Sequence, residues 1–237
     1  MTVSYSSCNQ CELKSKSNFK CLNQSALANV DSTKKHAKYH KGDYLFRKGE
    51  PVKGFFCMNM GSVRTFIAAE AKRKEYSFAI LFPGDWAGWR DTILDEVYSH
   101  SAVCLEDSNA CFVAKETILH LMQENFTFQR ELLFQMAREW QRSEKQAYSL
   151  GTKQIHSKLA ELLITFFHVS DKVPAIELKV TREVMASMIG TTTESVIRAL
   201  ADFKVREWIS LEKNKIVVFD YDSLFALSKI NEKEVLV

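Results

Sequence analysis

The sequence predicts an α+β protein in which a β-sheet domain, a long helix and a small helical domain follow one another. Six of the eight glycines lie between residues 42 and 88, where they separate short segments rich in β-branched and aromatic residues. Residues 116–150 contain neither glycine nor proline, which favours uninterrupted helix. Two helix-sized segments then meet at Gly190. A chain of 237 residues is long enough for two domains that each bury a core.

The glycine-rich stretch is expected to form antiparallel β-structure. Segments of strand length occupy residues 43–47, 54–60, 62–67, 76–81, 101–104 and 109–114. Short strands at hairpin spacing are typical of a small sandwich or jelly roll. The expected parts of the chain are a cysteine-containing N-terminal segment over 1–30, the β domain over 31–124, a long helix over 125–150 and a C-terminal domain over 151–237.

The long helix over 125–150 is expected to pair with a second copy of the chain. Apolar and small residues recur along it at alternating three- and four-residue steps, which is the pattern of a coiled-coil seam. The seam comprises Leu133, Met136, Trp140, Ser143, Ala147 and Leu150. Packing of this stripe on the β domain is the alternative. A helix of this length, rising about 1.5 Å per residue, extends past a small domain, and we therefore expect a homodimer.

The C-terminal domain contains the spacing of a helix-turn-helix. Residues 182–189 and 193–205 are helix-sized segments on either side of Gly190, which can take the positive φ angle of a tight turn. Ala186 is small where the two helices would cross, and the threonines after Gly190 offer hydroxyl groups that cap the second helix. Two short apolar segments over 208–211 and 216–219 then predict a β hairpin, or wing.

The second helix of this motif is expected to read DNA. Arginine can donate two hydrogen bonds to guanine, and glutamate can accept one from cytosine. Cations before the helix would lie beside phosphates. A solvated salt bridge between Glu194 and Arg198 is the alternative interpretation. The expected DNA-binding residues are Thr192, Thr193, Glu194, Ser195 and Arg198 on the helix, with Lys179 and Arg182 before it.

Other classes of protein are excluded by composition and motif. No apolar run approaches the length of about 20 residues that crosses a bilayer, and the N-terminal residues lack a secretory signal, so we expect a cytoplasmic protein with no membrane contact. The net charge is only +3, and any contact with nucleic acid must therefore be local. The sequence has no nucleophile elbow, phosphate loop or paired-carboxylate motif, and we do not expect an enzyme.

The order of these parts resembles the Crp/Fnr family of bacterial transcription regulators. The stretch MASMIGTTTESVIRAL is similar to the family's recognition motif, and HKGDYLFRKGEPVKGFFCMNMGSVRTF resembles the start of its effector domain. The resemblance covers nearly the whole chain. It implies a cyclic-nucleotide-binding-like β-roll, a dimerisation helix and a winged helix-turn-helix, in a homodimer that binds a palindromic site on double-stranded DNA and contacts RNA polymerase. It assigns base reading to Glu194 and Arg198, and Ile197 departs from the small or hydroxyl residue usual before that arginine.

The resemblance also bears on the effector. Cyclic-nucleotide-binding members carry a glycine-glutamate pair and then an arginine-serine pair, where this chain has Gly88-Trp89 and His100-Ser101. A cyclic nucleotide would lose both the hydrogen bond to its ribose and the charge-assisted clamp on its phosphate. We therefore do not expect a cyclic nucleotide as effector.

The cysteines predict a different effector. Cys8 and Cys11 form a CxxC pair, Cys21 follows after nine intervening residues and Cys111 lies far along the chain. Four thiolates can hold an iron-sulfur cluster, and the resemblance to the fumarate-nitrate regulator branch implies this set, although the gap before Cys21 is longer than usual there. We expect a response to oxygen, nitric oxide or redox state. The alternatives are that the cysteines bind zinc, have another redox role or bind no cofactor, or that the β-roll takes an organic ligand. A protein of another class, a metal or redox sensor that acts through protein contacts, is a further alternative.

Overall fold

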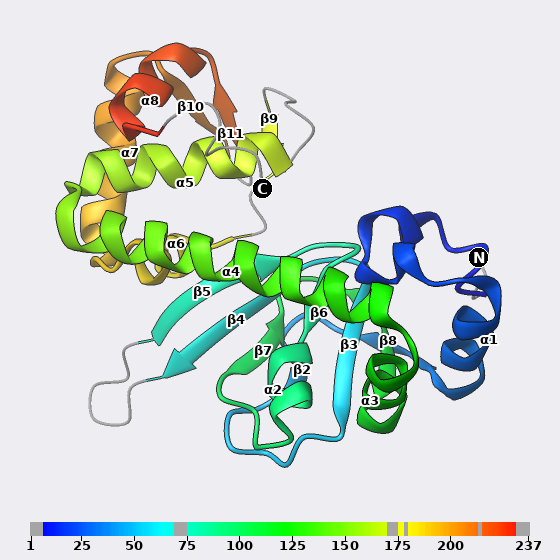
Figure 1. Ribbon diagram of the computed structural model, residues 1–237. Helices are drawn as coiled ribbons and strands as arrows, with labels where there is room; N and C mark the ends of the chain where they lie inside the picture. The colour runs from blue at the N-terminus through cyan, green and yellow to red at the C-terminus, as the bar shows by residue number, and fades with distance from the viewer. Residues whose placement is uncertain (1–6, 69–74, 170–174, 178–179, 213–214, 231–237) are drawn as a thin grey trace. The chain divides into compact units, whose positions relative to one another are not determined.

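The computed structural model describes residues 7–68, 75–169, 175–177, 180–212 and 215–230 (Figure 1). The chain forms two compact units, Met1–Gln141 and Arg142–Val237. Among the described residues no helix combines the length and the apolar character that crossing a membrane requires. Lys179, one of the expected DNA-binding residues, lies outside the described part of the chain.

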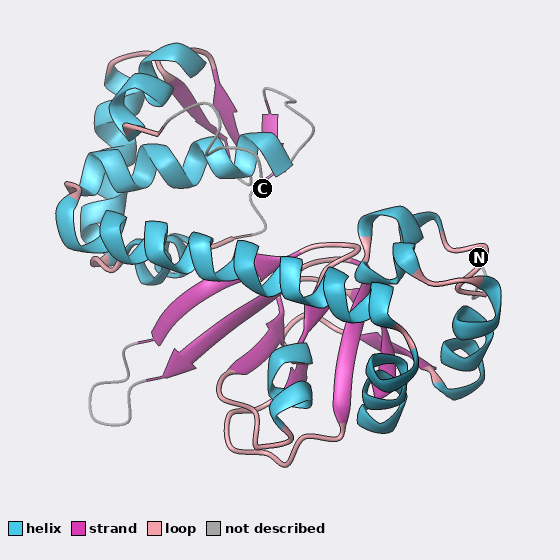
Figure 2. Ribbon diagram, viewed as in Figure 1, coloured by secondary structure: helices cyan, strands magenta, loops and turns pink. Residues whose placement is uncertain are grey.

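The first unit contains the predicted β domain as two four-stranded antiparallel sheets, drawn in magenta in Figure 2. One sheet has the strand order β1-β8-β3-β6 and the other β2-β7-β4-β5. The strands are β1 (Lys35–Tyr39), β2 (Tyr44–Phe46), β3 (Gly54–Met60), β4 (Val63–Ala68), β5 (Glu75–Leu81), β6 (Trp86–Ala87), β7 (Ser101–Cys104) and β8 (Ser108–Ala114). Buried residues of both sheets, among them Phe46, Phe56, Val63 and Ala110, form one apolar cluster between them. The predicted β-roll is confirmed.

The outer face of the first sheet is covered by helices and by the N-terminal segment. These elements are the 3₁₀ helices η1 (Glu12–Lys16) and η2 (Asn18–Cys21), and the α-helices α1 (Gln24–Thr33), α2 (Trp89–Leu94), α3 (Lys115–Glu124) and the start of α4 (Phe126–Thr152). Side chains alternate between the faces of a strand, so Phe56 and Met58 of β3 enter the core between the sheets. Phe55 of β3 instead packs with Phe19 and Phe128 in a second apolar cluster.

The second unit contains the predicted winged helix-turn-helix. Its elements are α5 (Ile155–Val169), β9 (Ala175–Glu177), α6 (Arg182–Ile189), α7 (Thr193–Val205), β10 (Ile209–Glu212), β11 (Lys215–Val218) and α8 (Tyr221–Ser228). Gly190 has a φ angle of 66° and ends α6, as the sequence predicts. The Thr192 hydroxyl accepts the Ser195 backbone N–H at 3.2 Å and caps α7. The wing hairpin gains a third strand, β9, which the sequence analysis does not predict.

Candidate sensor cavity and DNA-binding surface

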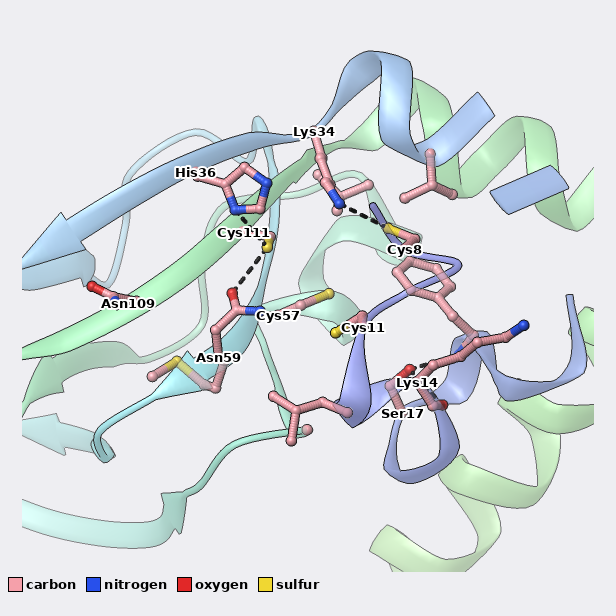
Figure 3. Close-up of a pocket in the computed structure, with 16 residues that line it drawn as sticks. Cys8, Cys11, Lys14, Ser17, Lys34, His36, Cys57, Asn59, Asn109 and Cys111 are labelled. Carbon is pink, nitrogen blue, oxygen red and sulfur yellow. Dashed lines mark hydrogen bonds between the residues drawn. The ribbon is translucent and has the colours of Figure 1, made fainter. Parts of the chain in front are cut away.

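Four cysteines line one cavity of about 120 Å³ in the first unit. Cys8 and Cys11 belong to the N-terminal segment, Cys57 to β3 and Cys111 to β8. Figure 3 shows their sulfur atoms turned toward the same space. The other polar lining residues are Lys14, Ser17, Lys34, His36, Asn59 and Asn109. The cavity therefore brings together thiols that are separated by most of the β domain in sequence.

Strand register explains why two of these thiols meet. Cys57 lies directly opposite Cys111 on the neighbouring strand, Cys111 lies opposite His36 of β1, and Cys57 lies opposite Trp86 of β6. Residues that face each other across antiparallel strands share one face of the sheet, with Cβ atoms about 4.5–5.5 Å apart. A transverse row of four side chains thus crosses the sheet, with the two thiols at its centre.

A polar network holds the CxxC segment beside this row. Both carboxylate oxygens of Asp31 accept the backbone N–H of Cys8, at 2.8 and 2.9 Å. Asp31 also pairs with Lys34, whose side chain is only 7% exposed. Lys34 Nζ in turn donates to Cys8 Sγ at 3.2 Å. A buried cation costs free energy unless it is paired, and here a carboxylate and a thiol sulfur serve as its partners.

Burial favours the protonated form of Cys8, Cys57 and Cys111. It raises the pKa of Cys8 from 9.0 to about 11, although Lys34 acts in the opposite direction. Burial likewise raises the pKa of Cys57 well above its ordinary value and that of Cys111 to a smaller extent. The Cys111 thiol donates to Asn59 Oδ1 at 2.9 Å, and its sulfur lies 3.2 Å from His36 Nδ1. Cys8, Cys57 and Cys111 are therefore protonated at neutral pH, and a metal that bound them would release protons.

Cys21 does not line the cavity. Its thiol donates to the Asn18 carbonyl oxygen at 3.4 Å, and its side chain packs against the apolar cluster that contains Phe19. Of the four cysteines expected as ligands, the structure brings together Cys8, Cys11 and Cys111. Within the described residues, no group of three or more histidine, cysteine, aspartate or glutamate side chains is arranged to hold a single metal ion.

Cys57 is the cavity residue that sequence reasoning missed. It stands in the apolar strand GFFCMNM, where a cysteine has the character of an ordinary buried residue. Alternation along β3 places it on the same face as Phe55 and not with Phe56 and Met58. That alternation was the available signal, but the partner strand and its register were needed to show what Cys57 faces.

The side chains expected to read DNA lie on the outer side of α7. Glu194 and Arg198 are exposed and Thr193 is partly exposed, whereas the opposite side buries Val196 and Leu200. Ile197 is 53% exposed beside Arg198, so this face also presents one apolar side chain.

Capping lowers the pKa of Glu194 on α7, and burial lowers that of Arg182 on α6. Hydrogen bonds at the N-terminus of α7, with its backbone and with Thr192, lower the pKa of Glu194 and keep this carboxylate ionised. Arg182, at the start of α6, is partly exposed, and burial lowers its pKa. Arg182 is the first residue of α6, and the turn at Gly190 separates that helix from α7.

The expected dimer seam lies on exposed positions of α4. Leu133 is 64% exposed and Trp140 71% exposed, and Met136 is also exposed. Ser143 and Ala147 continue the exposed stripe, and Leu150 is partly buried. Within the chain the β domain is packed by a different stripe of α4, which buries Phe128 and Leu132.

Comparison with known proteins shows what these two units are. Residues 36–125 match the cyclic nucleotide-binding domain family, and residues 157–227 match the Crp-like helix-turn-helix domain family. The chain belongs to the Crp/Fnr family. It is a DNA-binding transcription regulator of that family, whose members are not enzymes.

Similar proteins place this Crp/Fnr regulator on the Fnr-like branch. The transcriptional activator protein anr of Pseudomonas aeruginosa is 25% identical over 194 residues, which cover 79% of this chain and 78% of that protein. The fumarate and nitrate reduction regulatory protein of Vibrio cholerae is 23% identical over 217 residues, covering 90% and 86%. The structure of FixK2 from Bradyrhizobium japonicum has the same fold, with a TM-score of 0.78, 19% identity and coverage of 84% of this chain and 99% of that one.

His100, which the resemblance matches to the arginine of the cyclic-nucleotide-binding members, lies in the first unit. Its imidazole is buried, lies 3.5 Å from the Asp91 carboxylate and contacts the rings of Phe46 and Phe78 edge-on. Burial lowers the pKa of His100, while Asp91 acts in the opposite direction. Trp89, which the resemblance matches to the glutamate of those members, is buried and donates its indole N–H to Glu139 at 3.3 Å.

Proposed function

We propose that this regulator is a cytoplasmic homodimer that binds a palindromic DNA site, contacts RNA polymerase and responds to oxygen, nitric oxide or redox state through an iron-sulfur cluster. One observation carries the sensing part: Cys8, Cys11 and Cys111 line a single cavity. Two similar proteins support it by name, the fumarate and nitrate reduction regulatory protein of Vibrio cholerae and the anaerobic regulatory protein of Pasteurella multocida.

The donor set fits a cluster. Cysteine thiolates are the usual ligands of iron-sulfur clusters, and the cavity supplies thiols from two separate parts of the chain. Lys34, already buried beside Cys8, offers a positive charge against which thiolates can form. When bound, a cluster supplies iron and sulfide that react with oxygen and nitric oxide. The chain's own part is to tie the N-terminal segment to β8 through Cys8, Cys11 and Cys111.

The apolar cluster beside the cavity offers a route from the cysteines to α4. Phe19, two residues before Cys21, packs with Trp86 at a ring-centroid distance of 4.5 Å and with Phe128 of α4 at 6.2 Å. A shift of the N-terminal segment therefore changes what the first turns of α4 pack against. In a homodimer paired through α4, we propose that such a shift favours one arrangement of the paired helices over another.

DNA recognition rests on the exposed face of α7. Arg198 can read guanine, and Glu194 can read cytosine in a neighbouring pair. Arg182 and Lys179 are proposed to contact phosphates, which position the helix without reading sequence. Binding-site selection with the full-length protein tests this part. Enrichment of no sequence over random duplex, together with affinity that does not fall as salt is added, would reject it.

Anaerobic purification tests the sensing part. The full chain, expressed and purified without oxygen, is expected to be coloured and to contain iron and acid-labile sulfide, and its absorption spectrum is expected to change on exposure to air or nitric oxide. A colourless protein with neither iron nor sulfide would reject the cluster. Zinc at one ion per chain would instead support a thiolate zinc site in the same cavity.

A further inference from the structure

We propose that Cys57, and not Cys21, completes the thiolate set of the cavity. The site then consists of two pairs, Cys8 and Cys11 on the N-terminal segment and Cys57 and Cys111 on facing strands. This inference rests on the proposed iron-sulfur function, because it assigns the fourth ligand of that cluster.

The register of the sheet places Cys57 beside Cys111. Cys57 is the direct cross-strand partner of Cys111, and the two thiols line the same cavity. Rigid strands therefore hold them as neighbours before any metal arrives. Ligands on strands are positioned more precisely than ligands on loops, so the strand pair provides a fixed half of the site.

The N-terminal pair supplies the other half. Cys8 is anchored by Asp31 and Lys34, and Cys11 faces the same space in Figure 3. Cys57 lines the same cavity as Cys8, Cys11 and Cys111, as a shared ligand must.

Cys21 fails the same comparison. Cys21 is not among the residues that line the cavity, and its thiol is already hydrogen-bonded to the Asn18 carbonyl oxygen. Phe19 lies two residues earlier in η2 and is packed against Phe55, Trp86 and Phe128. Moving Cys21 into the cavity would unwind η2 and disturb the burial of Phe19. Cys57 needs no such rearrangement.

Single substitutions in the full chain separate the two assignments. Cys57→Ser and Cys21→Ser are compared with Cys111→Ser as the positive control and Cys104→Ser as the matched control, since Cys104 is a buried thiol in the other apolar cluster. Iron and acid-labile sulfide per chain are measured after anaerobic purification. Cys57→Ser and Cys111→Ser are expected to lose at least about tenfold in iron content, because changes even in the groups around metal ligands cost about 10–100-fold in affinity. Cys21→Ser and Cys104→Ser are expected to match the unaltered chain.

A second measurement keeps the inference testable if Cys57→Ser folds poorly. The unaltered chain is alkylated anaerobically before and after a chelator and an oxidant have removed its iron, and the modified cysteines are mapped by mass spectrometry. Alkylation of Cys8, Cys11, Cys57 and Cys111 is expected to rise on iron removal, while that of Cys21 stays constant. A rise at Cys21 with none at Cys57 would overturn the assignment.

These measurements test the assignment of Cys57 and the presence of a cluster separately. Iron and sulfide that persist in Cys57→Ser but are lost in Cys21→Ser would reject Cys57 as the fourth ligand and still support an iron-sulfur cluster. An unaltered chain without iron or sulfide would reject the iron-sulfur cluster itself. Zinc in the unaltered chain, lost in Cys57→Ser and retained in Cys21→Ser, would reject iron and sulfide yet support the set of four thiols.

Discussion

Lys34 sets the charge balance of the cysteine cavity. Its ammonium group is buried between the Asp31 carboxylate of α1 and the sulfur of Cys8, which lies on the N-terminal segment and lines the cavity. Hydrogen bonds to charged groups contribute about 1.5–3 kcal/mol, and a charged group left without its partner is costly. Lys34 therefore ties the N-terminal segment to the domain even without a metal.

Lys34→Met is expected to lower the free energy of unfolding of the full chain by about 1–3 kcal/mol, because it leaves Asp31 without its cation. The neighbouring Lys35 is exposed, and Lys35→Met is the matched control, with an expected change within about 0.5 kcal/mol. Chemical denaturation followed by linear extrapolation gives both values. Equal effects of the two substitutions would contradict the role given to Lys34.

Arg198 is the residue proposed to read guanine. Arg198→Ala is expected to cost about 1–3 kcal/mol of discrimination at one base-pair position, since a bidentate contact is lost. Lys204, exposed near the end of the same helix, provides the comparison, because loss of a cation that contacts phosphate weakens binding about equally on all sequences. Binding-site selection with both variants makes the measurement, and full sequence preference in Arg198→Ala would refute base reading.

The stability of the β-roll is expected to decrease at low pH because of His100. Burial lowers its pKa below 6.5 in the folded chain, with Asp91 opposing and Arg90 reinforcing the shift. The unfolded chain therefore takes up the proton first as the pH falls. Stability from the neutral imidazole is complete above about pH 6.5 and decreases as the pH falls below that value.

His100→Gln is expected to reduce the loss of stability below about pH 6.5, because an amide stays neutral over this range. Denaturation midpoints measured across this range test it, with the exposed His120 replaced by glutamine as the control. An unchanged pH profile in His100→Gln would contradict the assignment to this imidazole.

The apolar residues of helix α4 form two stripes, one buried against the β domain and one exposed. Phe128 and Leu132 face the apolar cluster of the β domain, while Leu133, Met136 and Trp140 remain exposed. The heptad pattern predicts the second stripe as a seam, and its exposure in the single chain agrees with a role in pairing. Trp140 is the largest apolar side chain on that stripe, and tryptophans are frequent hot spots of protein interfaces.

Trp140→Glu is expected to weaken the homodimer by about 2 kcal/mol or more, or roughly thirtyfold in dissociation constant, because it removes apolar contact and introduces charge into the seam. Gln141→Glu adds the same charge at the next exposed position and is expected to leave the dimer intact. Analytical ultracentrifugation measures both dissociation constants. A dimer unaffected by Trp140→Glu would place the interface elsewhere.

The complete regulator is expected to need two half-sites at a defined separation. A twofold dimer places its two recognition helices about 34 Å apart, or one turn of DNA. Inserting about five base pairs between the half-sites moves one half-site to the opposite side of the duplex and is expected to reduce affinity to that for a single half-site. An insertion of about ten base pairs restores the facing and serves as the comparison. Equal affinity for all three spacings would argue against binding as a dimer.

The sequence by itself determined several features of this protein that depend on residues close together in the chain. Glycines and alternating side chains predicted six of the eight strands of the β-roll and missed β1 and β6, heptad spacing predicted α4, and the turn at Gly190 predicted the helix-turn-helix. The capping of α7 by a threonine that follows Gly190 was predicted in the same way. The CxxC pair was visible because its two residues are three positions apart.

Only the tertiary structure decided which cysteines share the cavity. Whether Cys57 meets Cys111 depends on the pairing and register of β3 and β8, where a slip of one residue would turn either thiol to the other face. Whether Cys21 joins them depends on how Phe19 packs against residues of β3, β6 and α4. The third strand of the wing, β9, likewise depends on pairing with a distant segment. Contacts between distant segments arise from the packing of the whole unit, and a local pattern of residues therefore does not specify them.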